Sequence, residues 1–199
     1  MKILIRWKQR ERGSSRRFIP STSGRLPLAY PLPIMARTAI LGAGFETHAN
    51  VREFPPGWSP ALARFAPESL AGPAQTLCWL ARALASKRVS LPPLRAILIA
   101  FTGETYGELG AAGRSLLSET FRVPVFEQMR NASGELLAAE CAAHTGLHLV
   151  NSLQSLGSAL LEFDSIDQGP CPCGSLLPRL VTAESVKSGN DGHKAAAAG

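Results

Sequence analysis

The sequence predicts an α/β fold in which a mixed sheet carries flanking helices. Two observations support this class. Leucines at helical spacing mark residues 72–87 as an amphipathic helix, and the almost wholly apolar stretch 95–101 is typical of a buried strand. A second helix at 107–121 and a second strand at 123–127 repeat the pattern, so helices alternate with strands as in βαβ units.

The first helix, "GPAQTLCWLARALASK", is the best defined element. Leu77, Leu80 and Leu84 recur on one face, and Lys87 follows where the negative end of the helix dipole favours a cation. Cys78 lies within this helix, and its simplest interpretation is a small core residue.

The remaining segments are read from turns and composition. "SLPPL" ends the first helix, glycines weaken the helix at 107–121, and residues 128–135 form a loop before a third strand at 136–141. Upstream, residues 36–45 are a short apolar stretch, and the segment after it is irregular and rich in proline. We therefore expect an extension at 1–34, a folded domain at 35–180 and a disordered tail at 181–199.

The net charge of +6 is concentrated at the N-terminus. Residues 1–34 hold eight basic side chains and one acid, whereas the other 165 residues hold 13 basic and 14 acidic groups. The folded part is thus close to neutral, which argues against a nucleic-acid partner. A disordered extension is the favoured interpretation of 1–34; a transit peptide and a phosphate-binding arm are the alternatives.

No segment is predicted to span a membrane, because the longest run without charged residues, 141–161, is interrupted by polar side chains. Four cysteines in 199 residues do not indicate a secreted disulfide scaffold. Cys171 and Cys173 are also too close in sequence for an easy mutual bridge. We therefore expect a reducing, cytoplasmic location.

Two short pairs of residues have the spacing of metal ligands. Cys141 and His144 stand in "ECAAHTG", after the third strand, and Cys171 and Cys173 stand in "GPCPCG". Zinc prefers tetrahedral sulfur and nitrogen ligands, and structural sites commonly join two such pairs. The sequence predicts a structural zinc site made by these four residues, with His148 as a competing ligand or a hydrogen-bond partner of a ligand.

Two other interpretations of the cluster remain open. The cysteines could be unliganded core residues, with the histidines on the surface. Cys141 and a histidine could also form a nucleophilic pair, although no orienting acid is evident.

Residues 70–180 resemble adenylate-forming enzymes of the phenylacetate–CoA ligase type, including their capsule-biosynthesis-like relatives. The resemblance rests on "AECAAHTGLH" followed by "GPCPCG" and "LPRL", on "TGET" after a Leu-rich strand, and on the strand "VPV". It implies a fragment of the large domain of these enzymes, with a small metal knot. It also implies ATP- and Mg²⁺-dependent activation of a carboxylic acid, followed by transfer to coenzyme A.

The resemblance also suggests site residues. Gly103 and Glu104 match the turn that borders the adenine pocket, and Asp167 matches the acid that binds the ATP ribose. Glu135 is the candidate Mg²⁺-binding acid, although the aromatic residue of the family's catalytic loop is lost in "RNASGE". The only faint candidate for the family's phosphate loop is "PSTSGRLP" at 20–27, and the family's mobile C-terminal domain has no counterpart in the sequence.

We therefore expect a truncated or degenerate acid–CoA ligase-like protein whose activity is weak or absent in this chain alone. A separate C-terminal domain or a second copy of the chain would then be its partner. The alternative is a non-catalytic, zinc-containing binding module with a basic N-terminal arm.

Overall fold

The computed structural model describes residues 25–26, 28–29, 31, 36–150 and 165–181. Residues 182–199 of the predicted tail and most of the predicted extension lie outside the described residues. Val181, predicted as the first residue of the tail, is instead the last residue of a strand. Within the described ranges, none of the helices has the length and apolar character needed to cross a membrane.

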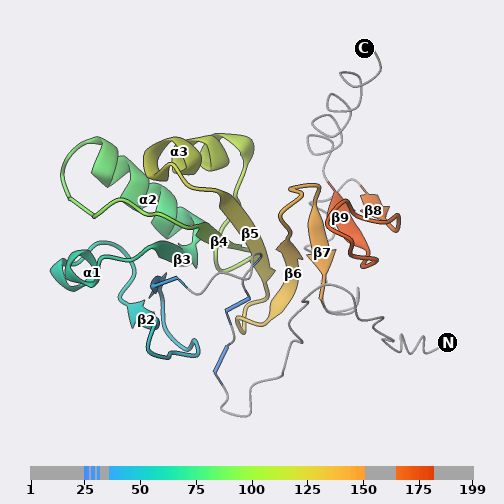
Figure 1. The fold of residues 1–199 in the computed structure, drawn as a ribbon, viewed down its shortest axis with the longest axis horizontal. Helices are drawn as coiled ribbons and strands as arrows, with labels where there is room; N and C mark the ends of the chain where they lie inside the picture. Colours follow the sequence, from blue (N-terminus) through green and yellow to red (C-terminus); the bar gives the residue numbers. More distant parts are fainter. Residues whose placement is uncertain (1–24, 27, 30, 32–35, 151–164, 182–199) are drawn as a thin grey trace.

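The described residues form three helices and nine strands (Figure 1). In chain order these are β1 Thr38–Leu41, β2 Val51–Phe54, α1 Pro60–Phe65, β3 Ser69–Pro73, α2 Ala74–Ala85, β4 Leu98–Thr102, α3 Ala111–Phe121, β5 Val125–Arg130, β6 Leu136–Glu140, β7 Leu147–Leu149, β8 Ser165–Asp167 and β9 Arg179–Val181.

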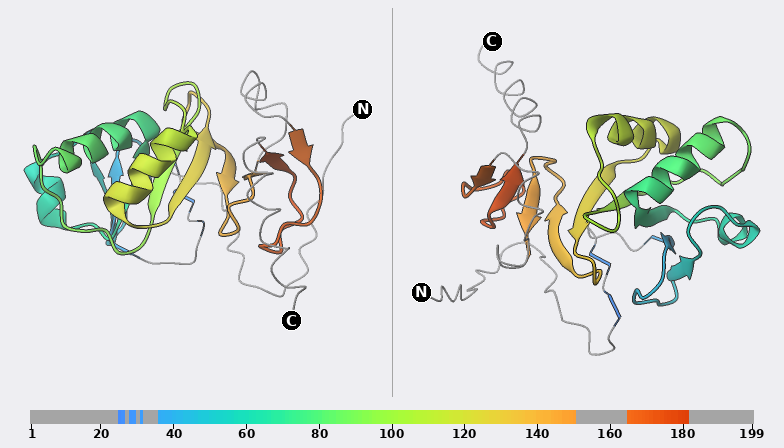
Figure 2. Two further views of the ribbon diagram at one scale, coloured as in Figure 1. Left: turned by 90° about the horizontal axis from the view of Figure 1, so that it is seen from above. Right: turned by 180° about the vertical axis from the view of Figure 1, so that it is seen from behind.

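The strands make one mixed sheet in the order β2-β1-β3-β4-β5-β6-β7-β9-β8. The first five strands in this order are parallel, and every pair from β5 onward is antiparallel. A register shift at Met129 and Arg130 marks the change of direction. The sheet therefore has a parallel half, which carries the helices, and an antiparallel half (Figure 2). Cys141, Cys171 and Cys173 lie in the antiparallel half, and Cys78 lies on α2.

Alternation along the parallel strands produces two cores. One lies between the sheet and helices α2 and α3, where Leu77 and Leu80 of α2 pack on Leu70 and Leu98 of the strands. The opposite face buries Ile40, Ile99, Phe101 and Phe126, among others. The antiparallel half has a separate cluster of buried hydrophobic residues.

Part of the predicted N-terminal extension contributes to this fold. Leu26 exchanges backbone hydrogen bonds with the loop after β1, donating to Gly44 O at 2.8 Å and accepting from Glu46 N at 2.9 Å. Leu26 and Leu28 also pack against the core on the face opposite the helices. The ordered chain thus includes residues upstream of position 35.

The predicted mixed α/β class with flanking helices is confirmed. The helix expected at 72–87 is α2, and the strands expected at 95–101 and 136–141 correspond to β4 and β6. The segment predicted as irregular holds three short elements instead, β2, α1 and β3. Each has only four to six residues, which is too short for hydrophobic periodicity to stand out among the prolines.

Candidate metal centre

Two turns in the antiparallel half of the sheet carry the three clustered cysteines. Cys141 directly follows β6 and begins a turn in which His144 N donates to Cys141 O at 3.0 Å. Cys171 begins the second turn, between β8 and β9, in which Gly174 N donates to Cys171 O at 2.8 Å. Both turns leave the cysteine side chains free to converge on one point.

His148 completes the group from the middle of β7. Its strand neighbours Leu147 and Leu149 are buried in the local core, so the period of two places the imidazole on the opposite side of the strand. The Nδ1 atom lies 3.3 Å from Leu177 O and the Nε2 atom lies 3.5 Å from Cys173 Sγ. If Nδ1 carries the proton and donates to the carbonyl, Nε2 keeps its lone pair for a metal.

The geometry of the four side chains fits zinc. The ligand atoms of Cys141, His148, Cys171 and Cys173 all lie within 4.8 Å of one another. Tetrahedral zinc with Zn–S bonds of about 2.3 Å and Zn–N bonds of about 2.0 Å sets two sulfurs roughly 3.8 Å apart and a sulfur and a nitrogen roughly 3.6 Å apart. The Cys141–Cys171 sulfur pair is separated by 3.6 Å, and the Cys173–His148 pair by 3.5 Å. A donor set of three thiols and one imidazole suits this metal.

The surroundings of the thiols set their pKa values in opposite directions. Burial raises the pKa of the Cys141 thiol to about 12. Burial also acts to raise the pKa of Cys171, but hydrogen bonds from the Thr145 hydroxyl and the backbone of Cys173 outweigh it and lower the pKa to about 6. Cys171 thus ionises near neutral pH, and a bound dication would favour ionisation of Cys141.

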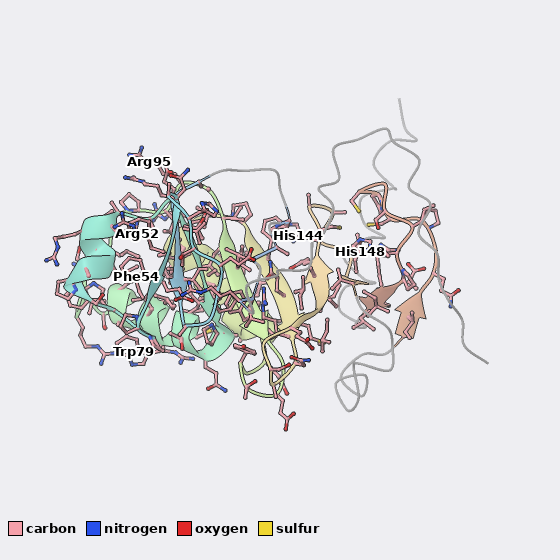
Figure 3. The ribbon with its side chains drawn as sticks, turned by 90° about the horizontal axis from the view of Figure 1, so that it is seen from below. Arg52, Phe54, Trp79, Arg95, His144 and His148 are labelled. Carbon is pink, nitrogen blue, oxygen red and sulfur yellow. The ribbon has the colours of Figure 1, made fainter. Side chains whose placement is uncertain are left out.

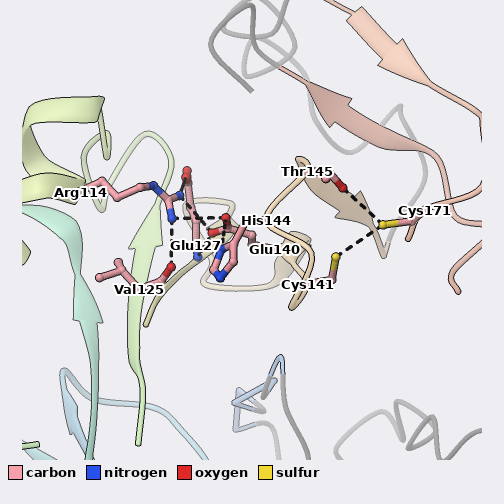
Figure 4. A network of polar contacts seen from close by, with 8 residues as sticks. All are labelled: Arg114, Val125, Glu127, Glu140, Cys141, His144, Thr145 and Cys171. Carbon is pink, nitrogen blue, oxygen red and sulfur yellow. Dashed lines mark hydrogen bonds and ion pairs between the residues drawn. The ribbon is translucent and has the colours of Figure 1, made fainter. Parts of the chain in front are cut away.

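A chain of polar contacts connects Cys171 to the edge of the sheet. The Thr145 hydroxyl lies 3.4 Å from Cys171 Sγ (Figure 4). It also accepts a hydrogen bond from Arg179 Nη1 at 2.6 Å. Arg179 also forms an ion pair with Asp167. The Asp167 carboxylate accepts from Gly169 N at 2.7 Å, and this bond, together with the Arg179 charge, lowers the pKa of Asp167. Asp167 therefore helps to hold Arg179 and Thr145 beside the metal ligands.

His144, predicted as the fourth ligand, belongs to a different network. Its Nδ1 atom lies 2.8 Å from Glu140 Oε1, and its ring stacks on Phe126 with centroids 4.7 Å apart. Glu140 also accepts from Arg114 at 3.0 Å, and Arg114 pairs with Glu127 at 3.2 Å (Figure 4). This network ties helix α3 to strands β5 and β6.

The structure thus groups His148, and not His144, with the three cysteines. Figure 3 shows His148 beside the sulfur atoms and His144 closer to the helical half of the molecule. The Cys-x-x-His spacing pointed to His144, but the ladder between β6 and β7 decides which histidine faces the thiols. The alternation of "GLHLV" predicts a strand around His148, but it does not by itself say which histidine faces the thiols.

Three of the residues predicted to bind a nucleotide lie at the edge of the sheet where the parallel strands β4 and β5 have their carboxyl ends. Gly103 and Glu104 follow β4, and Glu135 ends the turn after β5. A Cβ atom at Gly103 would collide with the carbonyl oxygen of Arg130, so the turn after β4 is in direct contact with the end of β5. The Glu135 carboxylate accepts from Asn131 Nδ2 at 2.8 Å.

Arg130 is buried beside these turns. Its guanidinium lies over the rings of Phe45 and Phe101, at 5.1 Å and 4.7 Å from their centroids, and donates to Gly134 O at 2.8 Å. Burial lowers the pKa of Arg130 to about 10. An open cavity of about 380 Å³ lies elsewhere, lined by Pro56, Gly57, Trp58, Gln75, Thr76 and Trp79.

Asp167 is not close to the other predicted nucleotide ligands. It belongs to β8, which is five strand positions away from β4 in the sheet. At about 4.8 Å per strand this separation is roughly 24 Å. The structure therefore brings Gly103, Glu104 and Glu135 to one edge and leaves Asp167 at the far end with Arg179.

Comparison with known proteins adds no assignment, because no protein-family model matches the chain and no curated protein matches it.

Proposed function

We propose that this chain is a zinc-stabilised α/β domain of the adenylate-forming type, in which ATP-dependent activation of a carboxylic acid is weak or absent in the chain alone. The observation that carries the zinc part is the convergence of Cys141, His148, Cys171 and Cys173 within 4.8 Å. Zinc there would be structural, because four protein ligands leave no open coordination position for a substrate.

The role of the zinc follows from the elements that it joins. Cys141 follows β6, His148 lies in β7, and the other two ligands lie in the loop that connects β8 to β9. These last two strands have only three residues each, and β8 is largely exposed at the sheet edge. Zinc would fasten this small ladder to the rest of the sheet and so determine whether the antiparallel half is ordered.

The adenylate-forming part of the proposal rests on the sequence resemblance. Gly103 and Glu104 lie beside the turn that ends in Glu135, as a nucleotide site at this edge would require. Two features argue for weak activity. Arg130 covers the rings of Phe45 and Phe101 beside this edge, and Asp167 is paired with Arg179 at the far end of the sheet. A small carboxylic acid and coenzyme A would be the substrates of any residual activity.

The second candidate function is a non-catalytic, zinc-containing binding module with a basic N-terminal arm. The observation that favours it is the engagement of Asp167, which already holds Arg179 beside the metal site. In this case zinc would still be present, but the chain would not bind ATP.

Three measurements on the purified protein test these proposals. Elemental analysis should find about one zinc per chain. Calorimetry with Mg·ATP should show weak binding or none. A pyrophosphate-release assay over a panel of carboxylic acids should show weak activity or none. Metal-free protein that melts at the same temperature with and without added zinc would contradict the structural site.

The nucleotide experiments separate the two candidates. Binding heat with Mg·ATP that is reduced in a Glu104→Gln variant would favour the adenylate-forming domain. Zinc-loaded protein that gives no heat would favour the binding module. Rapid pyrophosphate release by the chain alone would contradict both candidates.

A further inference from the structure

Two sulfur atoms of the metal group come from separate turns and lie close to bonding reach. Cys141 Sγ and Cys171 Sγ are 3.6 Å apart, although 30 positions separate them in the sequence. A disulfide has an S–S bond of about 2.05 Å, so each sulfur would need to move by about 0.8 Å. Both residues stand at the first position of a turn, where a side-chain rotation can supply this movement without disturbing a strand (Figure 4).

A bridge between Cys171 and Cys173, or one that involves Cys78, is less favourable. Cys171 and Cys173 are separated only by Pro172, and a bridge between them would have to close a strained ring. Cys78 lies on α2, near Gly113 of α3, and is outside the metal group. A disulfide in this cluster would therefore link the two turns.

The group is also open to a small oxidant on one side. Cys171 is buried and Cys141 is partly buried, but Cys173 is exposed to solvent. A thiolate at an accessible position is the usual point of attack for a hydroperoxide. Cys173 gives the oxidant its entry to a site whose other thiols are shielded.

We propose that the cysteine group is a redox-sensitive metal centre, in which a hydroperoxide converts the zinc-bound thiolates into a disulfide between Cys141 and Cys171 and releases the metal. This proposal rests on the proposed zinc site. It adds a regulatory modification that depends on the distance between the two sulfurs and on the exposure of Cys173.

The chemistry balances in three steps. The Cys173 thiolate attacks the peroxide oxygen, which breaks the O–O bond and yields a sulfenic acid, while the leaving alkoxide or hydroxide takes a proton from solvent to become an alcohol or water. The Cys141 thiolate attacks that sulfur and expels hydroxide, which takes a proton to become water, so that a mixed disulfide forms. The Cys171 thiolate then displaces Cys173 from Cys141. Overall, two thiols lose two electrons and two protons, and the hydroperoxide is reduced.

The disulfide would replace the metal as the connection between the two turns. Losing Cys141 and Cys171 leaves zinc with only His148 and Cys173, too few ligands for tight binding. The new bond nevertheless joins the end of β6 to the loop between β8 and β9, the same elements that zinc joins. Oxidation should therefore release zinc without freeing the β8–β9 ladder from the sheet.

The test treats the zinc-loaded, full-length protein with hydrogen peroxide. Zinc release is followed with a chromogenic chelator, and the disulfide is located by peptide mapping under non-reducing conditions. We expect about one zinc to be released per disulfide formed, and dithiothreitol with added zinc to restore the starting state. The oxidised protein should melt at a higher temperature than reduced protein that has been stripped of zinc by a chelator. A Cys78→Ser variant should behave like the wild type.

The results separate this proposal from the one on which it rests. Absence of zinc before oxidation would remove the zinc site itself and the switch with it. Zinc that is present but stays bound under peroxide would overturn the switch alone. Zinc release with sulfinic acid and no cross-turn disulfide would overturn it as well.

Discussion

The Thr145 hydroxyl lies 3.4 Å from the sulfur of Cys171, and this contact helps to lower the pKa of that thiol to about 6. Arg179 fixes the hydroxyl in place by donating to it at 2.6 Å. The turn that carries Thr145 thus acts on a cysteine 26 residues further along the chain.

Replacing Thr145 with valine should raise the pKa of Cys171, because valine cannot donate a hydrogen bond to the thiolate. The absorbance of the thiolate, followed in metal-free reduced protein as pH rises, should show a first midpoint near pH 6 in the wild type. In Thr145→Val this midpoint should move upward. Thr105→Val, in the exposed turn after β4, is the matched control and should leave it unchanged. Identical titrations of Thr145→Val and the wild type would show that the hydroxyl has no influence on Cys171.

The two histidines should respond differently to removal. His148→Ala should weaken zinc binding by more than about a hundredfold, because it deletes a ligand and not merely a hydrogen-bond partner of one. His144→Ala should weaken binding by less than about tenfold, since His144 contacts Glu140 and Phe126. Competition with a chelating dye measures both affinities. A larger loss in His144→Ala than in His148→Ala would show that His144, and not His148, is the fourth ligand.

The sequence predicted those elements whose pattern extends over several turns or fills a strand. Helix α2 could be predicted because Leu77, Leu80 and Leu84 repeat on one face of its 12 residues. Strand β4 was recognised because a fully buried strand of a parallel sheet is almost wholly apolar. Helix α1 was missed although Ser59 accepts a hydrogen bond from Leu62 N and Pro60 occupies its first turn. A serine cap and a proline in the first turn are both signals of a helix start.

The candidate site was predictable in its sulfur ligands but not in its histidine. The spacing of Cys141, Cys171 and Cys173 is visible in the sequence, and the structure brings the three together. The choice between His144 and His148 depends on the pairing of β6 with β7. The position of Asp167 depends on the order of strands across the sheet, which a local pattern of residues does not encode.

The buried carboxylate of Glu127 should make stability fall as pH rises. Burial raises the pKa of Glu127 above its ordinary value of 4.5, despite the opposing contacts with Thr102 and Arg114. The folded protein therefore retains the proton to higher pH than the unfolded chain does. The contribution of Glu127 to stability is full below pH 4.5 and decreases as pH rises through the folded-state pKa.

A Glu127→Gln variant should lack this part of the pH dependence. Urea denaturation of zinc-loaded protein at several pH values from 4.5 to neutrality measures it, because the contribution from zinc binding is common to both proteins. Glu119→Gln, on the exposed face of α3, should keep the wild-type slope. Equal slopes in the Glu127→Gln variant and the wild type would refute the raised pKa.

Gly146 should be less tolerant of alanine than Gly174, although both lie in the turns of the metal centre. Both have positive φ angles, +122° and +86°, which cost an L-residue about 1–3 kcal/mol. Around Gly174 no atom lies within 4 Å of the Cβ position, whereas at Gly146 a Cβ would lie 2.5 Å from the carbonyl oxygen of Leu180. Gly174→Ala thus measures the backbone strain alone, and Gly146→Ala adds a collision with β9.

We expect losses in the free energy of unfolding of about 1 kcal/mol for Gly174→Ala and at least about 3 kcal/mol for Gly146→Ala, measured by urea denaturation with zinc present. Equal losses would mean that β9 does not pack against the turn at Gly146 as the structure describes.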